Sequence, residues 1–242
     1  MASLVSRPLL SLTDIGSPKG VMGSSQASPP TGVTPLKPSW ETMLTDASAV
    51  AVPVEKRQST RFKSTGKNGQ TFTWLWAQDI SQMMKREECE RLADLAQGKT
   101  VLEVGACLGC STISLASTAE YVVSVDWHRG DTQTVGWGFT AVQYLANLIR
   151  YGVLDKVSAV VADCNRIGAL FADDHFDMAF IDGDHRLDCV RRNIELFLPK
   201  VRSPGVIAFH DYGAKDCFEK QAVDERFNQP DELVGTLAII NV

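Results

Sequence analysis

Acidic side chains and one histidine recur at the ends of short apolar segments in the C-terminal half of the chain. Asp126 closes the segment VVSVD, Asp163 closes VVAD, and Asp182 opens the run DGDH after an apolar segment. His210 and Asp211 follow the last of these segments, in IAFHDY. Carboxylates are costly to bury unless they are paired or bound to something. Their repetition therefore indicates a ligand cleft rather than packing.

A glycine-rich turn precedes these acids, in the stretch VLEVGACLGCSTIS at 101–114. A triphosphate-binding loop needs a lysine after its last glycine, and no lysine follows Gly109. A dinucleotide-binding turn brings three glycines close to a pyrophosphate, and Glu103 stands in place of the first of them. A carboxylate repels pyrophosphate but suits a cationic ligand. S-adenosylmethionine, which carries a sulfonium and an ammonium, is such a ligand.

The elements that must position these residues alternate along the chain. Apolar runs predict buried strands at 101–104, 121–125, 157–161, 178–181, 206–209 and 233–240. Amphipathic runs predict helices at 111–117, 140–150, 187–198 and 216–226. This alternation predicts an α/β fold with a doubly wound, mostly parallel sheet and helices on both faces. Such sheets bind ligands at the carboxyl ends of their strands, where the acids are expected to gather.

The order of these motifs resembles the class I S-adenosylmethionine-dependent methyltransferases over roughly residues 75–242. The shared features are E-x-G-x-x-x-G, an acid that ends the second strand and an aspartate that ends the third. The resemblance implies a Rossmann-like sheet of seven strands. It also implies three groups of cofactor contacts: Glu103, Gly105, Gly109 and Ser111 at the methionine part, Asp126 and Trp127 at the ribose, and Asp163 and Cys164 at the adenine.

The stretch FDMAFIDGDHRLDCVRRNIELFLPKVRSPGVIAFHDY at 176–212 is similar to the metal-dependent O-methyltransferases of the catechol and macrolide-sugar types. The resemblance implies a divalent cation, Mg²⁺ by its oxygen ligands, held by Asp182, His210 and Asp211. The family usually has a carboxylate-rich or Asp-Asn pair where this chain has His-Asp, and this set also suits Mn²⁺, Fe²⁺ or Zn²⁺. Asp182, His210 and His185 are the candidate catalytic residues. His185 is the candidate general base, since an ordinary imidazole titrates near neutrality.

The function predicted from these motifs is metal-assisted O-methylation of a small molecule that bears a hydroxyl. A non-catalytic protein that keeps the cofactor fold stays open as an alternative. A related metal-binding N-methyltransferase or hydroxylase-like enzyme also stays open. The loop at 129–138 (RGDTQTVGWG) is a candidate lid or substrate wall, and His128 is expected to be exposed beside it.

Three parts follow from the composition along the chain. Residues 1–55 hold seven of the ten prolines and predict a disordered Pro/Ser-rich arm. Residues 56–98 predict an N-terminal helical or cap segment, in which Asp79 and Gln82 form a capping box and Gly98 ends the last helix. Residues 99–242 form the predicted S-adenosylmethionine-binding methyltransferase domain.

Composition narrows the partners and the compartment. The net charge of −5 disfavours nucleic acid, and no apolar run is long enough for a membrane span. The start of the chain lacks the apolar core of a secretory signal, and the six cysteines read as small buried residues in a reducing cytoplasm. The single C-x-x-C of Cys107 and Cys110 predicts neither a zinc site nor a redox pair. A strand at 233–240 on the sheet edge is compatible with a homodimer.

Overall fold

The computed structural model describes residues 61–80, 83–130 and 138–242. The predicted arm at 1–55 and most of the predicted lid at 129–138 lie outside these ranges. Within them, no helix has the length and apolar character that crossing a membrane requires.

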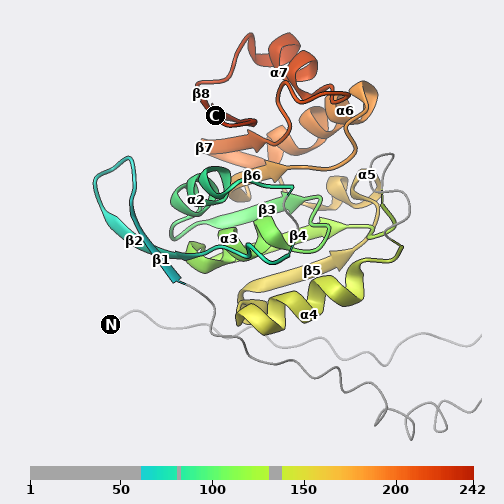
Figure 1. Cartoon of the computed structure of the whole chain (residues 1–242). Helices are drawn as coiled ribbons and strands as arrows, with labels where there is room; N and C mark the ends of the chain where they lie inside the picture. Colours follow the sequence, from blue (N-terminus) through green and yellow to red (C-terminus); the bar gives the residue numbers. More distant parts are fainter. Residues whose placement is uncertain (1–60, 81–82, 131–137) are drawn as a thin grey trace, which may run out of the picture. The chain divides into compact units, whose positions relative to one another are not determined.

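A seven-stranded sheet forms the centre of the described chain (Figure 1). Its strands lie in the order β5-β4-β3-β6-β7-β9-β8. The first five in this order run parallel, and β9 is antiparallel to both β7 and β8. The bounds are β3 Thr100–Val104, β4 Tyr121–Asp126, β5 Val157–Val161, β6 Phe176–Ile181, β7 Val201–Phe209, β8 Glu232–Val234 and β9 Leu237–Asn241. The predicted doubly wound fold is confirmed, although the single strand expected at 233–240 is a hairpin of two.

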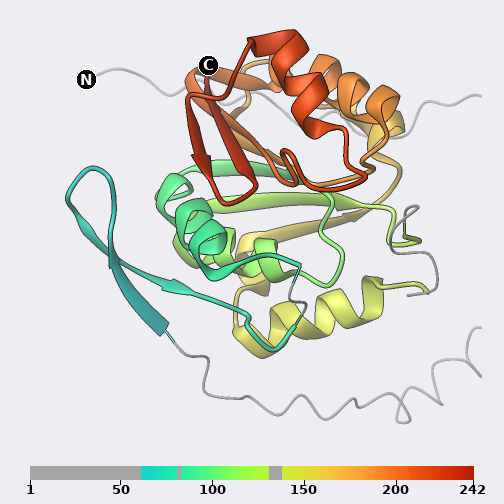
Figure 2. The ribbon, with the colours of Figure 1, turned by 45° about the horizontal axis from the view of Figure 1, so that its top comes forward.

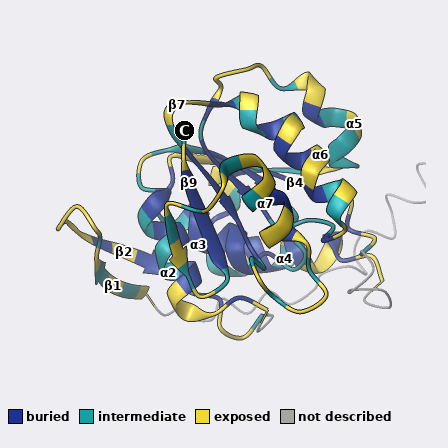
Figure 3. Ribbon diagram, turned by 90° about the horizontal axis from the view of Figure 1, so that it is seen from above, coloured by how far each residue is buried: buried dark blue, intermediate teal, exposed yellow. Residues whose placement is uncertain are grey.

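Helices cover both faces of this sheet. They are α2 Arg86–Leu95, α3 Cys110–Thr118, α4 Ala141–Tyr151, α5 Cys164–Ile167, α6 Leu187–Phe197 and α7 Glu219–Phe227, with 3₁₀ turns at Leu154–Lys156, Gly168–Leu170 and Leu198–Lys200. Successive strand residues point to opposite faces. Val101 packs in the cluster that holds α2, α3 and α4, whereas Leu102 and Val104 pack in the cluster that holds α6 and α7. Figure 3 shows the buried strands between helices whose outer surfaces are exposed.

A two-stranded hairpin precedes the sheet, where the sequence predicts a helical or cap segment. β1 Arg61–Thr65 pairs antiparallel with β2 Thr71–Leu75, and Figures 1 and 2 show this hairpin beside the main sheet. Trp74 is fully buried, and its indole N–H donates a hydrogen bond of 2.9 Å to the hydroxyl of Ser64. Phe62 lies across the hairpin from Trp74 and packs on its ring. Alternating aromatic residues therefore anchor the hairpin to the core.

The first helix among the described residues begins later than the capping pattern predicts. α2 starts at Arg86, and Asp79 lies in a turn rather than at a helix N-terminus. The Asp79 carboxylate accepts a hydrogen bond from the hydroxyl of Tyr151 and pairs with Arg150 at 2.9 Å, both at the end of α4. The prediction of a cap at Asp79 is wrong because distant side chains bind this carboxylate instead of nearby backbone amides. Gln82 lies outside the described residues.

The chain order reverses beside β3. From β3 the chain moves outward to β4 and β5, then returns to β6 on the other side of β3 and moves on to β7. The connections that follow β3 and β6 therefore run in opposite directions from the carboxyl ends of these two strands. This position is the usual ligand site of open α/β sheets.

Candidate active site

A cavity of about 320 Å³ lies at this edge of the sheet. That volume is within the range of small-molecule sites. Eight of the predicted site residues line it: Gly105, Ser111, Asp126, Trp127, Asp163, Cys164, Asp182 and His185. Four others do not line it: Glu103, Gly109, His210 and Asp211. The first group comes from the ends of β3, β4, β5 and β6, as the strand-end pattern predicts.

Gly105 lets two strand ends approach each other closely. Its φ of +88° belongs to the left-handed region that favours glycine. A Cβ at this position would lie 2.0 Å from the carbonyl oxygen of Asp182. Gly109, at φ +92°, lies under the ring of Tyr144 instead, and a Cβ there would lie 3.1 Å from that ring. Gly105 therefore fixes the spacing of the turn to β6, and Gly109 fixes how α3 starts.

Glu103 lies beneath the glycine-rich turn, on the α3 face of the sheet. Its side chain is fully buried. The hydroxyl of Ser111 donates to Oε1 at 2.6 Å, and those of Thr112 and Ser124 donate to Oε2 at the same distance. Burial raises the pKa of Glu103 to about 7 despite these donors. The carboxylate was expected to line the cofactor site, but in this geometry it reaches the cavity only through Ser111.

Asp126 ties the end of β4 to the glycine turn. Its Oδ2 accepts hydrogen bonds from the backbone N–H groups of Ala106 at 2.9 Å and Cys107 at 2.8 Å. Its Oδ1 accepts one from the N–H of His128 at 2.6 Å. A carboxylate has about four acceptor positions, so three backbone donors leave about one position for a ligand. Asp126 therefore shapes the turn as well as facing the cavity.

Trp127, predicted at the ribose, and Asp163 and Cys164, predicted at the adenine, all lie in the cavity wall. Trp127 is 48% exposed, and its indole N–H donates to the carbonyl of Gly130 at 2.8 Å. Asp163 caps α5, because its Oδ1 accepts from the N–H of Asn165 at 3.0 Å. Cys164 follows it in the cavity wall, and burial, followed by the charge of Asp163, raises the pKa of this thiol to about 11. This thiol is therefore neutral near pH 7.

Asp182, His210 and Asp211 converge beyond the cavity wall. Nδ1 of His210 lies 3.4 Å from Oδ1 of Asp182 and 3.5 Å from Oδ2 of Asp211. A cation bound at ~2.1 Å in tetrahedral coordination separates its donors by ~3.4 Å. The spacing of these atoms thus fits a metal ion, and the structure brings the three predicted ligands together. Asp182 belongs both to this cluster and to the cavity lining.

The backbone at Asp211 is held in a left-handed conformation, with φ +56°. This conformation is unfavourable for residues other than glycine, and it persists where the surrounding structure enforces it. The N–H of His210 donates to the carbonyl of Ile181 at 3.1 Å, and the N–H of Tyr212 donates to that of Thr236 at 2.9 Å. These two bonds hold the chain on either side of Asp211. They turn the Asp211 carboxylate toward His210.

Glu88 orients His210 from the opposite side. It lies on α2, is 1% exposed, and its Oε2 lies 3.3 Å from Nε2 of His210. Burial acts to raise its pKa, but His210 and the backbone N–H groups of Thr236 and Lys85 outweigh burial and lower it to about 2. Burial would lower the pKa of His210, but Asp182, Asp211 and Glu88 together raise it strongly. Without a bound cation, an imidazolium at His210 therefore neutralises part of this acidic cluster.

Sequence reasoning missed Glu88 although a signal was present. Glu88, Leu92 and Leu95 lie four and then three residues apart, which places the acid on the apolar face of α2. A carboxylate at such a position needs a buried partner.

His185 lines the cavity and is oriented by a second carboxylate that was missed. It is 5% exposed, and its Nδ1 lies 2.7 Å from Oε1 of Glu219, the first residue of α7. Burial would lower its pKa, but Glu219 outweighs burial and raises it to about 9. Nε2 of His185 lies 3.8 Å from Oδ2 of Asp211. The pairing of Glu219 with His185 has no signal in the sequence, since 34 residues separate them.

His128 is buried rather than exposed as expected. It is 2% exposed, its Nδ1 lies 2.9 Å from the hydroxyl of Thr140, and its ring packs on that of Tyr144. The expectation is wrong because the chain after β4 turns back against the start of α4. The N–H of Thr140 donates to the carbonyl of His128 at 3.1 Å.

Residues 102–212 match the family model described as a methyltransferase domain. This range runs from β3 to the residue after Asp211 and contains every strand end that faces the cavity. This part of the chain is therefore similar to a methyltransferase domain. None of the curated proteins compared with the chain matches it.

Several solved structures resemble the described fold. A protein from Corynebacterium glutamicum aligns with a TM-score of 0.52 at 14% identity, over 67% of this chain and 83% of its own. Cofactor-bound Rv0187 from MTB aligns with a TM-score of 0.49 at 25% identity, over 66% and 74%. The O-methyltransferase TomG from Streptomyces achromogenes, solved with S-adenosylmethionine, aligns with a TM-score of 0.48 at 22% identity, over 62% and 69%.

Proposed function

We propose that this protein transfers the methyl group of S-adenosylmethionine to a hydroxyl oxygen of a small molecule, assisted by a divalent cation. The similarity of residues 102–212 to a methyltransferase domain supports the reaction class. The observation that carries the proposal is the position of Asp182. It lines the cavity at the strand ends and also belongs to the cluster with His210 and Asp211. A methyl donor in the cavity and a hydroxyl at the cluster would therefore meet at one residue.

The charge of the cavity suits a cationic cofactor. Asp126, Asp163, Asp182 and Asp184 line it. The lining cations are both paired with carboxylates, Arg186 with Asp184 at 2.8 Å and His185 with Glu219 at 2.7 Å. A surplus of carboxylates favours a sulfonium over a phosphate group. Asp163 keeps Oδ2 outside its helix cap, where the exposed Arg166 lies 3.6 Å away, whereas Asp126 has three backbone donors, so Asp163 is the better test of cofactor contact.

The cation would be held by Asp182, His210 and Asp211. When bound, it lowers the pKa of a substrate hydroxyl and orients the oxygen. A nitrogen donor beside two carboxylates favours Mn²⁺, Fe²⁺ or Zn²⁺ over Mg²⁺. Glu88 at Nε2 fixes the His210 ring so that Nδ1 faces the two carboxylates. A carboxylate behind a metal-binding histidine is a common arrangement.

His185 is the proposed acceptor of the hydroxyl proton. Its ring lies in the cavity wall, and Glu219 at Nδ1 directs Nε2 toward Asp211 and the cluster. Once deprotonated, an imidazole whose pKa is about 9 is a strong base. The transfer itself asks mainly for alignment of oxygen, methyl and sulfur.

Titration calorimetry with S-adenosylmethionine tests the cofactor half. We expect binding to the wild-type protein and a loss of ~10-fold or more in Asp163→Asn, since hydrogen bonds to charged groups contribute ~1.5–3 kcal/mol. Asp155→Asn is the matched control, because Asp155 is an exposed carboxyl in the 3₁₀ turn that precedes β5, at the opposite end of this strand from the cavity. No binding to the wild type at high micromolar cofactor would refute the cofactor assignment.

Electron paramagnetic resonance of Mn²⁺ tests the cation half. We expect bound Mn²⁺ in the wild type and at least a ~10-fold weaker site in Asp182→Asn, because this change removes an anionic ligand. Transfer of labelled methyl to a panel of phenols, catechols and sugars should then fall when a chelator removes the metal. Cofactor binding without any Mn²⁺ binding would refute the role of the cation. Methyl transfer to the panel of phenols, catechols and sugars would then test the proposed reaction without a metal.

A further inference from the structure

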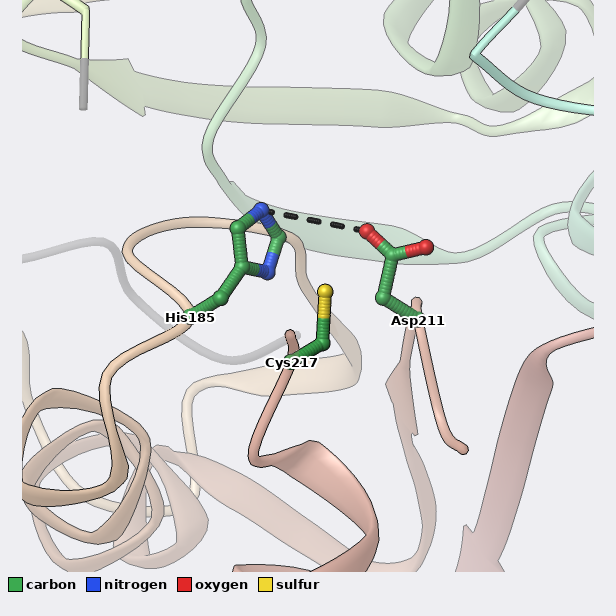
Figure 4. Close-up of side chains that lie close together, drawn as sticks. All are labelled: His185, Asp211 and Cys217. Atoms are coloured by element: carbon green, nitrogen blue, oxygen red, sulfur yellow. Dashed lines mark ion pairs between the residues drawn. The ribbon is translucent and has the colours of Figure 1, made fainter. Parts of the chain in front are cut away.

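A second group of metal-ligand atoms lies next to the first. A ring nitrogen of His185, a carboxylate oxygen of Asp211 and Sγ of Cys217 all lie within 4.8 Å of one another, and Nε2 of His185 lies 3.8 Å from Oδ2 of Asp211. Figure 4 shows the imidazole and the carboxylate facing each other, with the thiol between them on the α7 side. The three side chains come from three segments: the loop before α6, the end of β7 and the segment that leads into α7. Their convergence is therefore a product of the tertiary fold.

The backbone fixes this convergence. The N–H of Phe218 donates to the carbonyl of His185 at 3.2 Å, which places Cys217 beside the His185 loop. The N–H of Ala214 donates to the carbonyl of Asp211 at 3.0 Å, which closes the turn between Asp211 and Cys217. Both contacts are main-chain bonds. The positions of the three ligand atoms thus do not depend on flexible side chains alone.

Glu219 prepares the imidazole for a metal. Its Oε1 lies 2.7 Å from Nδ1 of His185, so a proton on Nδ1 is bonded there, and Nε2, which lies 3.8 Å from Oδ2 of Asp211, is the nitrogen left to bind a metal in place of its proton. Glu219 is 4% exposed, which keeps this contact away from water. A buried carboxylate that fixes the tautomer of a histidine is the usual support of a protein zinc ligand.

We propose that His185, Asp211 and Cys217 form a second cation site, which takes a thiophilic divalent metal such as Zn²⁺. The donor set of imidazole, carboxylate and thiolate is one that Zn²⁺ binds, with three protein ligands and one open position. The thiolate distinguishes this site chemically from the cluster of Asp182, His210 and Asp211, which offers no sulfur ligand. Asp211 belongs to both clusters, so the two sites are neighbours that share one carboxylate.

This site has a consequence for the proposed methyl transfer, although its existence does not rest on that function. A metal on Nε2 of His185 occupies the atom that would accept the hydroxyl proton. It also draws on the carboxylate of Asp211. Under the proposed function, a thiophilic metal at this site therefore blocks the base.

Cobalt absorption spectroscopy on the full-length protein tests the proposal. Co²⁺ binds as Zn²⁺ does, and a thiolate ligand gives it an intense near-ultraviolet charge-transfer band. We expect this band in the wild type, its loss in Cys217→Ser, and competition by added Zn²⁺. Cys189→Ser is the matched control, because Cys189 lines the cavity but belongs to neither cluster. Asp182→Asn should also keep the band, since Asp182 lies only in the first cluster.

Two further variants keep the test decisive if Cys217→Ser unfolds, as judged by circular dichroism. His185→Gln should weaken cobalt binding at least ~10-fold, and Glu219→Gln should weaken it ~10–100-fold while keeping the band at saturation. No band in the wild type at saturating cobalt would overturn the site. A band that survives with unchanged affinity in Cys217→Ser or His185→Gln would overturn it as well. Neither result bears on S-adenosylmethionine binding, so this proposal and the proposed function can fail separately.

Discussion

Replacing Gly105 by alanine should disrupt the ligand site more than the fold. A Cβ at Gly105 would lie 2.0 Å from the carbonyl oxygen and 2.5 Å from the carbonyl carbon of Asp182, and 2.9 Å from the nitrogen of Gly183. All three are backbone atoms, so no side chain can rotate away. The loop after β6 must move by ~1 Å or more to restore an ordinary contact. This movement carries Asp182 away from His210.

The size of the effect follows from comparison with Gly98. Gly98 also has a positive φ, +64°, but a Cβ there would meet no atom within 4 Å. Both alanine variants carry the cost of the left-handed conformation, ~1–2 kcal/mol, and both gain equally from a less flexible unfolded chain. Overpacking at Gly105 adds a further ~1–3 kcal/mol. Gly105→Ala should therefore lower the free energy of unfolding by ~1–3 kcal/mol more than Gly98→Ala does.

Urea denaturation followed by circular dichroism measures both free energies, and Mn²⁺ resonance and cofactor calorimetry measure the site. A displacement of ~1 Å in a ligand or positioning group can cost ~100-fold in function. Gly105→Ala should therefore lose most Mn²⁺ and cofactor binding, whereas Gly98→Ala should keep both. Equal stability of the two variants, within ~0.5 kcal/mol, together with normal binding in Gly105→Ala would refute the close contact between the turn and β6.

Three further variants test the buried carboxylates. The pKa of Glu103 is raised to about 7, so the folded state binds more protons than the unfolded state between pH 4.5 and 7. The free energy of unfolding should therefore fall by ~3 kcal/mol as the pH rises through this window. Urea midpoints of Glu103→Gln should lack this dependence on pH, and the same dependence in both proteins would contradict the raised pKa. Glu88→Gln should weaken Mn²⁺ binding ~10–100-fold with cofactor affinity unchanged, because it loosens His210 without touching the cavity. Gly235→Ala should weaken Mn²⁺ in the same way, since a Cβ there would lie 2.4 Å from Oε1 of Glu88; unchanged Mn²⁺ titrations for either variant would exclude Glu88 as the residue that positions His210.

The sheet could be predicted because its signals are local. Each parallel strand contains a short apolar run, and the runs predicted at 101–104 and 178–181 lie within two residues of the bounds of β3 and β6. The hairpin at 61–75 could not be located in this way. It is anchored by the burial of Trp74 and Leu75 against α3 and α2, which a local pattern does not reveal. The cap at Asp79 failed for a similar reason, because Arg150 is a long-range partner.

The features of the site also differ in whether they follow from the local sequence or from long-range packing. The acids at the strand ends could be predicted because parallel strands bring their carboxyl ends to one edge. The depth of each side chain could not. Glu103 and Asp126 both flank the glycine turn, yet Glu103 bonds hydroxyls beneath it, whereas Asp126 bonds the backbone of the turn itself and reaches the cavity. Only side-chain packing distinguishes these two roles.

The two histidines of the site are both oriented by carboxylates from segments that flank residues 102–212. His185 and His210 both lie within residues 102–212, the range that is similar to a methyltransferase domain. The carboxylates that orient them lie outside this range, Glu219 after it and Glu88 before it. Cys217, the sulfur donor of the proposed second site, also lies outside it. The matched range thus supplies most of the cavity lining and the convergent acids, whereas α2 and α7 contribute the carboxylates beside each imidazole. Since the nitrogen that faces the site is the one that binds a metal or accepts a proton, the chemistry of this site depends on contacts from beyond the matched range.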